Sequence, residues 1–245
     1  MKALLIRIGI DQAYGGWNAP VDANGHFVYV PIPERRDTRF HPGLERHYGE
    51  VLPALHRFCG GRNCDLYGDL RFPHGLLEHP MHLDPDFDYL TYGDVGGRRG
   101  AGLVNMGDGD LLVFYSSLRP IYRCEHKLIY ALMGMFVVAE VMPVASVPPH
   151  CWQENAHARR AKRGETDIVV WAKPAISGRF DRCIPIGEWR SGAYRVRHDV
   201  LDAWGGLSVK DGFIQRSAVP PTFKRPSKFL EWLQNQEVQL IAGNN

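Results

Sequence analysis

The 245-residue chain lacks the motifs that identify several large enzyme classes. It contains no GxGxxG, no P-loop ending in Lys-Ser/Thr, no GxSxG and no HExxH. These absences argue against a classical dinucleotide-binding enzyme, a P-loop triphosphatase, a serine hydrolase and a zincin-type protease. An EF-hand calcium loop that began at Asp84 would need glycine at its sixth position and glutamate at its twelfth, but these positions hold Tyr89 and Val95.

Cysteine is scarce and long apolar runs are missing. The five cysteines (59, 64, 124, 151 and 183) form no CxxC pair and are odd in number, so neither a disulfide framework nor a zinc finger is expected. No stretch approaches the roughly 18 apolar residues that would cross a membrane. The opening MKALLIRIGID reads as a strand rather than a signal peptide. We therefore expect a soluble cytoplasmic protein in a reducing compartment.

Neither positive nor negative charge is in large excess. The chain has 29 Lys plus Arg against 27 Asp plus Glu, a net charge of +2, which argues against the broad positive surface of a non-specific DNA binder. With 44% apolar residues it can bury a full core. No linker, repeat or low-complexity run divides it, so residues 1–245 are predicted to form one α+β domain.

Periodicity predicts mainly strands with a few helices. Helical spacing over 44–58 is interrupted by Pro53, which predicts two short pieces. Gly134 is a candidate bulge within 128–144. The expected strands are 3–10, 26–32, 111–115, 128–144, 167–173 and 182–187, and the other expected helices are 151–163 and one opening at Pro226.

The richest polar segment runs from residue 79 to 120. His82, Asp84, Asp86 and Asp88 share one parity, so an extended chain would present them on one face as a candidate metal site. The favoured interpretation is a helix start, with Asp84 as N-cap, Pro85 at the first helical position and Gly93 as the residue beyond the end. A third reading gives His82 or an aspartate an acid-base or hydrogen-bonding role.

Asp11 follows a buried strand and precedes a loop with a Gly15-Gly16 pair. A carboxylate at a strand's end is held firmly, while the loop shapes a cleft beside it. Trp17 could stack on a base and Asn18 could read a base edge. Alternatively, Asp11 caps the loop backbone and Trp17 covers the core.

Two further segments are candidates for ligand contact. Tyr92 precedes a glycine-rich loop in which Arg98 could hold a phosphate, although a surface loop explains this composition equally well. The pattern GDLLVFY is typical of small β-barrels that hold a base near the strand's end. Tyr115 and Arg119 would then contact the ligand, unless the pattern is simply a turn and a core strand.

Cys151 and His157 suggest nucleophilic catalysis at first sight. Six residues apart on a helix, they are separated by about 600° of rotation at 100° per residue, so direct pairing is not expected. The basic residues at 159–163 fit a solvated face or a patch that rests on nucleic-acid phosphates.

The segments LLIRIGID, GGWNAPVD, HLDPDFDYLTYGD, GDLLVFYSSLRP and IYALMGMFVVAEV together resemble the nucleotide modification associated domain 3 family. Such domains accompany systems that modify DNA bases in phages and bacterial defence. The resemblance covers residues 1 to about 190. The GDLLVFY portion is also similar to PUA-like and ASCH-like barrels, which implies a mixed or antiparallel sheet curled into a barrel core with flanking helices.

The resemblance implies a protein that processes a modified nucleotide or base in DNA, together with partner enzymes of a base-modification system. Asp11, His82 and Asp84 are the candidates for acid-base work, since an acid-base pair must reach one reacting atom. Two alternatives stay open: a non-catalytic reader of modified bases, and a nuclease for modified DNA that uses Mg²⁺ held by the aspartates. No resident metal or organic cofactor is identifiable from the residues.

Overall fold

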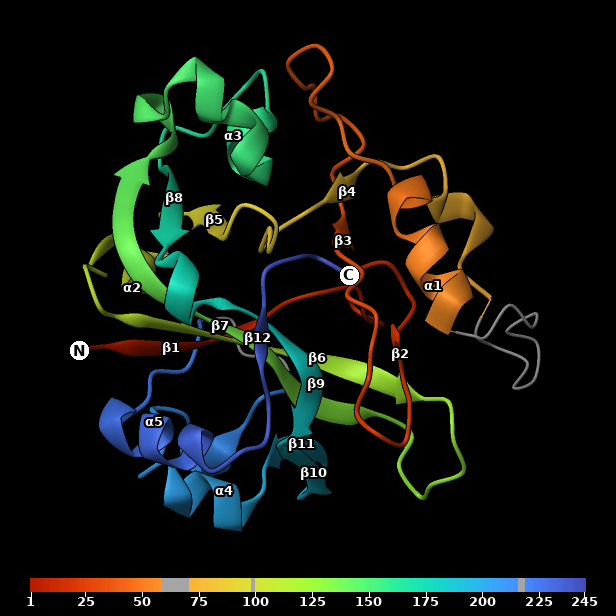
Figure 1. Cartoon of the computed structure of the whole chain (residues 1–245), viewed down its shortest axis with the longest axis vertical. Helices are drawn as coiled ribbons and strands as arrows, with labels where there is room; N and C mark the ends of the chain where they lie inside the picture. Colours follow the sequence, from red (N-terminus) through yellow and green to blue (C-terminus); the bar gives the residue numbers. More distant parts are fainter. Residues whose placement is uncertain (59–70, 98–99, 216–218) are drawn as a thin grey trace.

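A large mixed sheet forms the centre of the structure, a computed structural model that describes residues 1–58, 71–97, 100–215 and 219–245. Its main path runs in the order β1, β6, β7, β8, β5 (Figure 1). β1 is parallel to β6, and the later pairs of the path are antiparallel. These strands are β1 (Ala3–Arg7), β5 (Thr91–Val95), β6 (Leu111–Pro120), β7 (Ile129–Pro143) and β8 (Asp167–Ala172).

Shorter elements complete the fold. The remaining strands are β2 (Pro20–Val21), β3 (Ile32–Pro33), β4 (Met81–His82), β9 (Gly178–Pro185), β10 (Gly187–Arg190), β11 (Ala193–Val196) and β12 (Leu240–Ile241). The α-helices are α1 (Leu52–Phe58), α2 (Ala101–Val104), α3 (Ala156–Arg159), α4 (His198–Ala203) and α5 (Pro226–Gln234). The 3₁₀ turns are η1 (Tyr48–Glu50), η3 (His74–Leu76), η4 (Val144–Ser146), η5 (Pro149–Glu154), η6 (Pro174–Ile176) and η7 (Lys210–Gly212).

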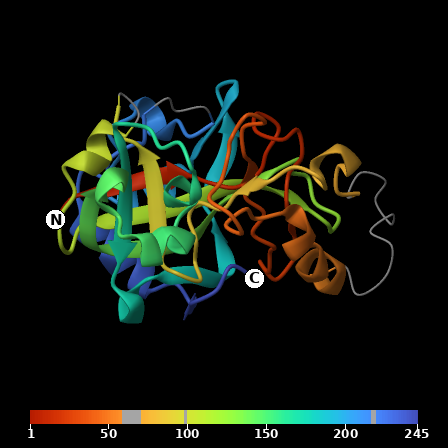
Figure 2. The same ribbon diagram turned by 90° about the horizontal axis from the view of Figure 1, so that it is seen from above.

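Both faces of the central strands are buried, because side chains alternate between two hydrophobic cores. Leu4 of β1 and Phe114 of β6 pack into one core, which α1 also joins. Leu5 and Val113 belong to the other core, which α4 and α5 cover. Figure 2 shows α1 set to one side of the body built by the long strands. The apolar runs in the sequence reflect this two-sided burial.

β7 is one long bent strand, and Gly134 lies at its irregularity as expected. The register with β9 shifts between Leu132 and Gly134. A Cβ at Gly134 would lie 2.6 Å from the carbonyl oxygen of Gly178, so a side chain cannot fit between the two strands. Residues 131–135 of β7 pair with β9, and residues 138–143, beyond the bulge, pair with β8.

The α+β class and the mixed sheet are confirmed, and the helical pieces around Pro53 form as η1 and α1. The described strands do not close into a barrel, because β1 and β5 end the strand path without pairing with each other. The barrel core expected from the resemblance is therefore not confirmed. No helix in the described ranges is both long and apolar enough to cross a membrane.

Three local predictions were wrong in whole or in part. The helix expected over 151–163 is limited to the 3₁₀ turn η5 and the short helix α3, because Asn155 between them has an extended backbone and caps α3. Most of 26–32 is buried but does not pair with a neighbouring strand as expected. The main chain of Tyr29 forms hydrogen bonds with the Asn245 side chain instead. Ile32 is the one residue of this segment that belongs to a strand, β3. The helix expected from Asp84 does not form. Asp86 and Thr91 instead exchange main-chain hydrogen bonds around a turn that leads directly into β5.

Candidate functional site

A cavity of about 630 Å³ opens beside the end of β1. Its wall is built from β1 and the loop after it, from β3, from β4 and β5 with the segment between them, from β6, from α3 and from residues 220–221. Among the lining residues are Arg7, Asp11, His82, Asp84, Tyr92, Asp94, Tyr115 and His157. Residues distant in the sequence therefore share one polar surface.

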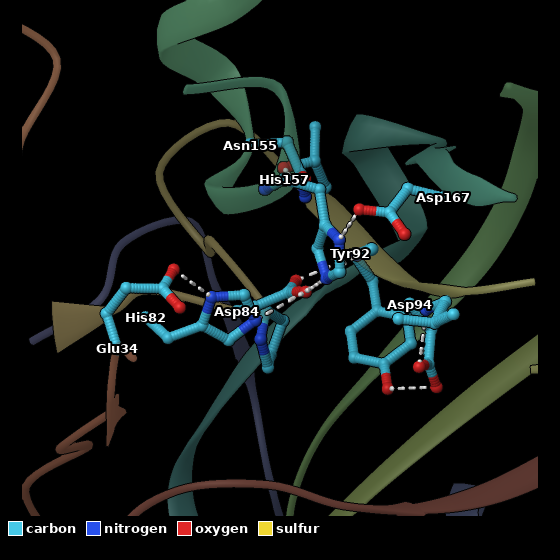
Figure 3. A network of polar contacts seen from close by, with 12 residues as sticks. Glu34, His82, Asp84, Tyr92, Asp94, Asn155, His157 and Asp167 are labelled. Atoms are coloured by element: carbon cyan, nitrogen blue, oxygen red, sulfur yellow. Dashed lines mark hydrogen bonds and ion pairs between the residues drawn. The ribbon is translucent and has the colours of Figure 1, made fainter. Parts of the chain in front are cut away.

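Three side chains converge on this wall (Figure 3). His82 ends β4, Asp84 lies two residues later, and His157 comes from α3. The Nε2 atoms of His82 and His157 lie 3.7 and 3.6 Å from Asp84 Oδ2, and one ligand atom of each residue lies within 4.8 Å of the others. The arrangement brings two imidazoles and one carboxylate to a single point.

Local structure holds each of the three in place. The Asn155 side chain caps α3 by accepting a hydrogen bond from the His157 main-chain N–H at 2.9 Å. The main-chain N–H of Gly93 donates to both oxygens of Asp84 at 2.9 Å. A Cβ at Gly93 would lie 2.6 Å from His157 Cδ2, so glycine allows β5 to approach the histidine closely.

Each histidine has a carboxylate behind it. His82 Nδ1 lies 3.0 Å from Glu34 Oε2, and His157 Nδ1 lies 2.8 Å from Asp167 Oδ2. A carboxylate only accepts hydrogen bonds, so the bonds to Glu34 and Asp167 place a proton on each Nδ1 and turn each Nε2 toward Asp84. Arg160 also lies near the two Nδ1 atoms, at 3.2 Å for His82 and 3.4 Å for His157. The Arg160 guanidinium contacts both carboxylates, at 2.9 Å for Glu34 and 3.7 Å for Asp167.

The electrostatics follow from burial and from these partners. Burial raises the pKa of Asp84 well above its usual value, although the Gly93 N–H opposes the shift. Burial lowers the pKa of His157 to about 4 against the opposing hydrogen bond to Asp167, so its ring is neutral at pH 7. Burial would raise the pKa of Glu34, but the hydrogen bond from His82 and the positive neighbours hold it well below its usual value.

Asp11 lies on the same cavity but in a different setting. Its carboxylate accepts hydrogen bonds from the main-chain N–H groups of Ala13 and Tyr14, at 2.7 and 3.0 Å, and pairs with Arg7. It therefore has the loop-capping contacts that the sequence allowed as an alternative, and it also lines the cavity with His82 and Asp84. The three predicted catalytic candidates thus share one cavity.

The predicted ligand contacts divide into two groups. Tyr92 and Tyr115 line the cavity, but both are buried, and the Tyr115 hydroxyl already donates to the Ile214 carbonyl at 2.7 Å. Trp17 packs edge-on against Phe72 in the core at 5.3 Å between ring centroids.

Asn18 is buried and donates to the Ser117 carbonyl at 2.8 Å. Neither Trp17, Asn18 nor Arg119 is among the cavity's lining residues, and Arg98 lies outside the described residues.

The sequence suggested His157 only as a possible partner of Cys151 and gave no link from it to His82 and Asp84. No local spacing could have done so, because more than 70 residues separate the two parts of the site. The only hint in the sequence was that both residues are histidines. Their carboxylate partners, Glu34 and Asp167, come close to them only after folding.

The chain was compared with protein families, curated proteins and solved structures. The model of the family described as nucleotide modification associated domain 3 matches residues 2–212, which is most of the chain and includes Asp11, His82, Asp84 and His157. No curated protein and no solved structure matches.

Proposed function

Because the chain belongs to the nucleotide modification associated domain 3 family, we propose that it is an enzyme that processes a modified nucleotide or base in DNA. Its setting is a phage or bacterial system for DNA modification or defence, with partner enzymes that act on the same base. The reaction takes place in the cavity beside His82, Asp84 and His157.

One observation carries the proposal: three reactive side chains meet on the wall of a cavity large enough for a nucleotide. The cavity volume of about 630 Å³ lies within the range of roughly 300 to 1,000 Å³ that is usual for small-molecule sites. A carboxyl group with a raised pKa beside a neutral imidazole is also the kind of pair that active sites assemble.

The rest of the wall supports a polar, partly aromatic ligand. Arg7 supplies a guanidinium that suits a phosphate, and its Nη1 is steadied by the Gln215 carbonyl at 2.7 Å. The Tyr92 ring provides apolar wall beside Asp84. A base within duplex DNA would have to leave the stack to reach this depth, so the substrate is a free nucleotide, a single strand or a flipped base.

The alternatives fit less well. A reader of modified bases needs a complementary pocket but gains nothing from two buried histidines, each backed by a carboxylate. A Mg²⁺ nuclease needs oxygen ligands, whereas two of the three converging groups are imidazoles. Both alternatives give distinct results in the experiment below.

The test is a screen by mass spectrometry and thermal shift, with nucleotides and short DNAs that carry normal and modified bases. The variant Asp84→Asn removes the carboxylate, and Asp108→Asn, at an exposed aspartate outside the cavity, is the matched control. We expect one substrate to change mass with the wild type and with Asp108→Asn, but not with Asp84→Asn. Thermal stabilisation without any mass change indicates a reader, and strand cleavage that requires Mg²⁺ indicates a nuclease; either result refutes the proposal.

A further inference from the structure

We infer that His82, Asp84 and His157 bind one divalent transition-metal ion through His82 Nε2, a carboxylate oxygen of Asp84 and His157 Nε2. The inference deepens the proposed function and rests on it for the task of the metal. The binding itself is argued from the geometry, the charges and the donor atoms of the site.

The ligand atoms are close to the spacing that a metal requires. Nitrogen and oxygen ligands lie roughly 2.0–2.2 Å from such ions, so two ligands of the same ion are roughly 3 to 3.5 Å apart. The two Nε2 atoms lie 3.6 and 3.7 Å from Asp84 Oδ2. These two distances need to shorten by a few tenths of an ångström. The ligand atoms of the two imidazoles lie within 4.8 Å of each other, so the rings must also rotate toward one another to share an ion.

Both imidazoles are already oriented as metal ligands. A histidine ligand commonly donates its second ring N–H to a carboxylate, which fixes the ring and makes the ligating nitrogen more basic. Glu34 does this for His82, and Asp167 does it for His157. The same arrangement occurs twice, on different elements, and both free nitrogens face the same carboxylate oxygen. Hydrogen bonds that served only to stabilise the fold would not require both Nε2 atoms to face the same Asp84 oxygen.

The charge of the site favours a divalent cation. Three carboxyl groups, those of Glu34, Asp84 and Asp167, surround the two imidazoles, and Arg160 contacts the outer two. Acidic side chains therefore outnumber the basic one at this point. A divalent cation bound between Asp84 and the two imidazoles would balance this excess.

The donor set indicates which metals bind. Two imidazoles and one carboxylate suit Fe²⁺, Co²⁺, Ni²⁺ or Zn²⁺, whereas Mg²⁺ and Ca²⁺ prefer sites made wholly of oxygen. Three protein ligands on one side of the ion leave its other positions directed into the cavity, where water or substrate can bind.

The test is a titration of chelator-treated protein with Co²⁺ alone, followed by its visible absorption, and with Zn²⁺ by calorimetry. We expect one equivalent to bind and a 100-fold excess of Mg²⁺ not to displace it. His82→Gln should weaken binding on the order of 100-fold or more, and the supporting variant Asp167→Asn about 10- to 100-fold. His126→Ala, at an exposed histidine outside the cavity, is the control and should bind like the wild type.

Wild-type protein that binds Co²⁺ no more tightly than folded His82→Gln would overturn the inference, as would equal competition by Mg²⁺. If His82→Gln fails to fold, Glu34→Gln replaces it, with the 10- to 100-fold loss expected of a supporting carboxylate. Nucleotide turnover by fully metal-free protein would refute a task for the metal in the reaction and leave the proposed function intact. Metal binding at the three residues without turnover of any nucleotide would support the metal site and refute the proposed function.

Discussion

A buried ion pair between Arg159 and Asp86 joins the two segments that carry the candidate site. Asp86 comes two residues after Asp84, and Arg159 two residues after His157. The Arg159 side chain is 2% exposed and the Asp86 side chain 0%, with Nη2 2.6 Å from Oδ2. Arg159 also donates to the Gln153 carbonyl at 2.9 Å. We predict that Arg159→Met strongly destabilises the fold.

The magnitude follows from the charge that is left behind. Removing one partner of a buried pair leaves an uncompensated charge and costs about 3–5 kcal/mol. For a chain of this size, each kcal/mol corresponds to about 2–4 °C in Tm, so the expected fall is about 6 to 20 °C. The double variant Arg159→Met/Asp86→Asn carries no buried charge at this point, so it should be more stable than Arg159→Met alone.

The assay is urea and thermal unfolding followed by circular dichroism, with Arg36→Met at an exposed arginine as the control. Co²⁺ affinity should fall in the folded fraction of Arg159→Met as well, because the pair holds both ligand segments. An Arg159→Met protein whose free energy of unfolding lies within about 1 kcal/mol of wild type would show that this pair contributes as little as an exposed ion pair, contrary to the prediction. So would a double variant no more stable than the single one.

Three further variants test the structure around the site. Gly93→Ala should cost about 1–3 kcal/mol in urea unfolding and weaken Co²⁺ binding, because its Cβ would meet His157; Gly107→Ala has open space and should be neutral in both measurements. Trp17→Ala should lower the free energy of unfolding by about 3–5 kcal/mol, because the ring is buried in the core. A change near zero would instead favour the ligand contact that the sequence suggested for this ring. Tyr115→Phe should lose about 1–3 kcal/mol by leaving a buried carbonyl unpaired, and unchanged stability would contradict that hydrogen bond.

The strands could be predicted because their apolar runs report burial directly. The 111–115 and 128–144 segments are central strands, and Gly134 lies at a bulge as its position suggested. Asp84 could not be predicted in the same way. Asp-Pro followed by acidic residues favours a helix start locally. The Arg159 side chain, which comes from far along the chain, and the Gly93 main-chain N–H instead hold the segment in another conformation.

The candidate site was only half visible in the sequence. Asp11 was identified as a carboxylate at the end of an apolar strand, and His82 and Asp84 as members of a dense polar segment that share one parity. The structure places all three on one cavity. His157 and the supporting Glu34 and Asp167 were missed. Their role depends on which elements fold against one another, and no periodicity within a single segment contains that information.

A crystal structure of the Co²⁺-loaded protein, with anomalous diffraction measured at the cobalt edge, would locate the metal directly. We expect one strong anomalous peak bonded to His82 Nε2, Asp84 and His157 Nε2 at about 2.0–2.2 Å, on the cavity side of the three residues. A cobalt ion bound elsewhere, or none at full loading, would contradict the claim that these three side chains form a metal-binding reaction centre.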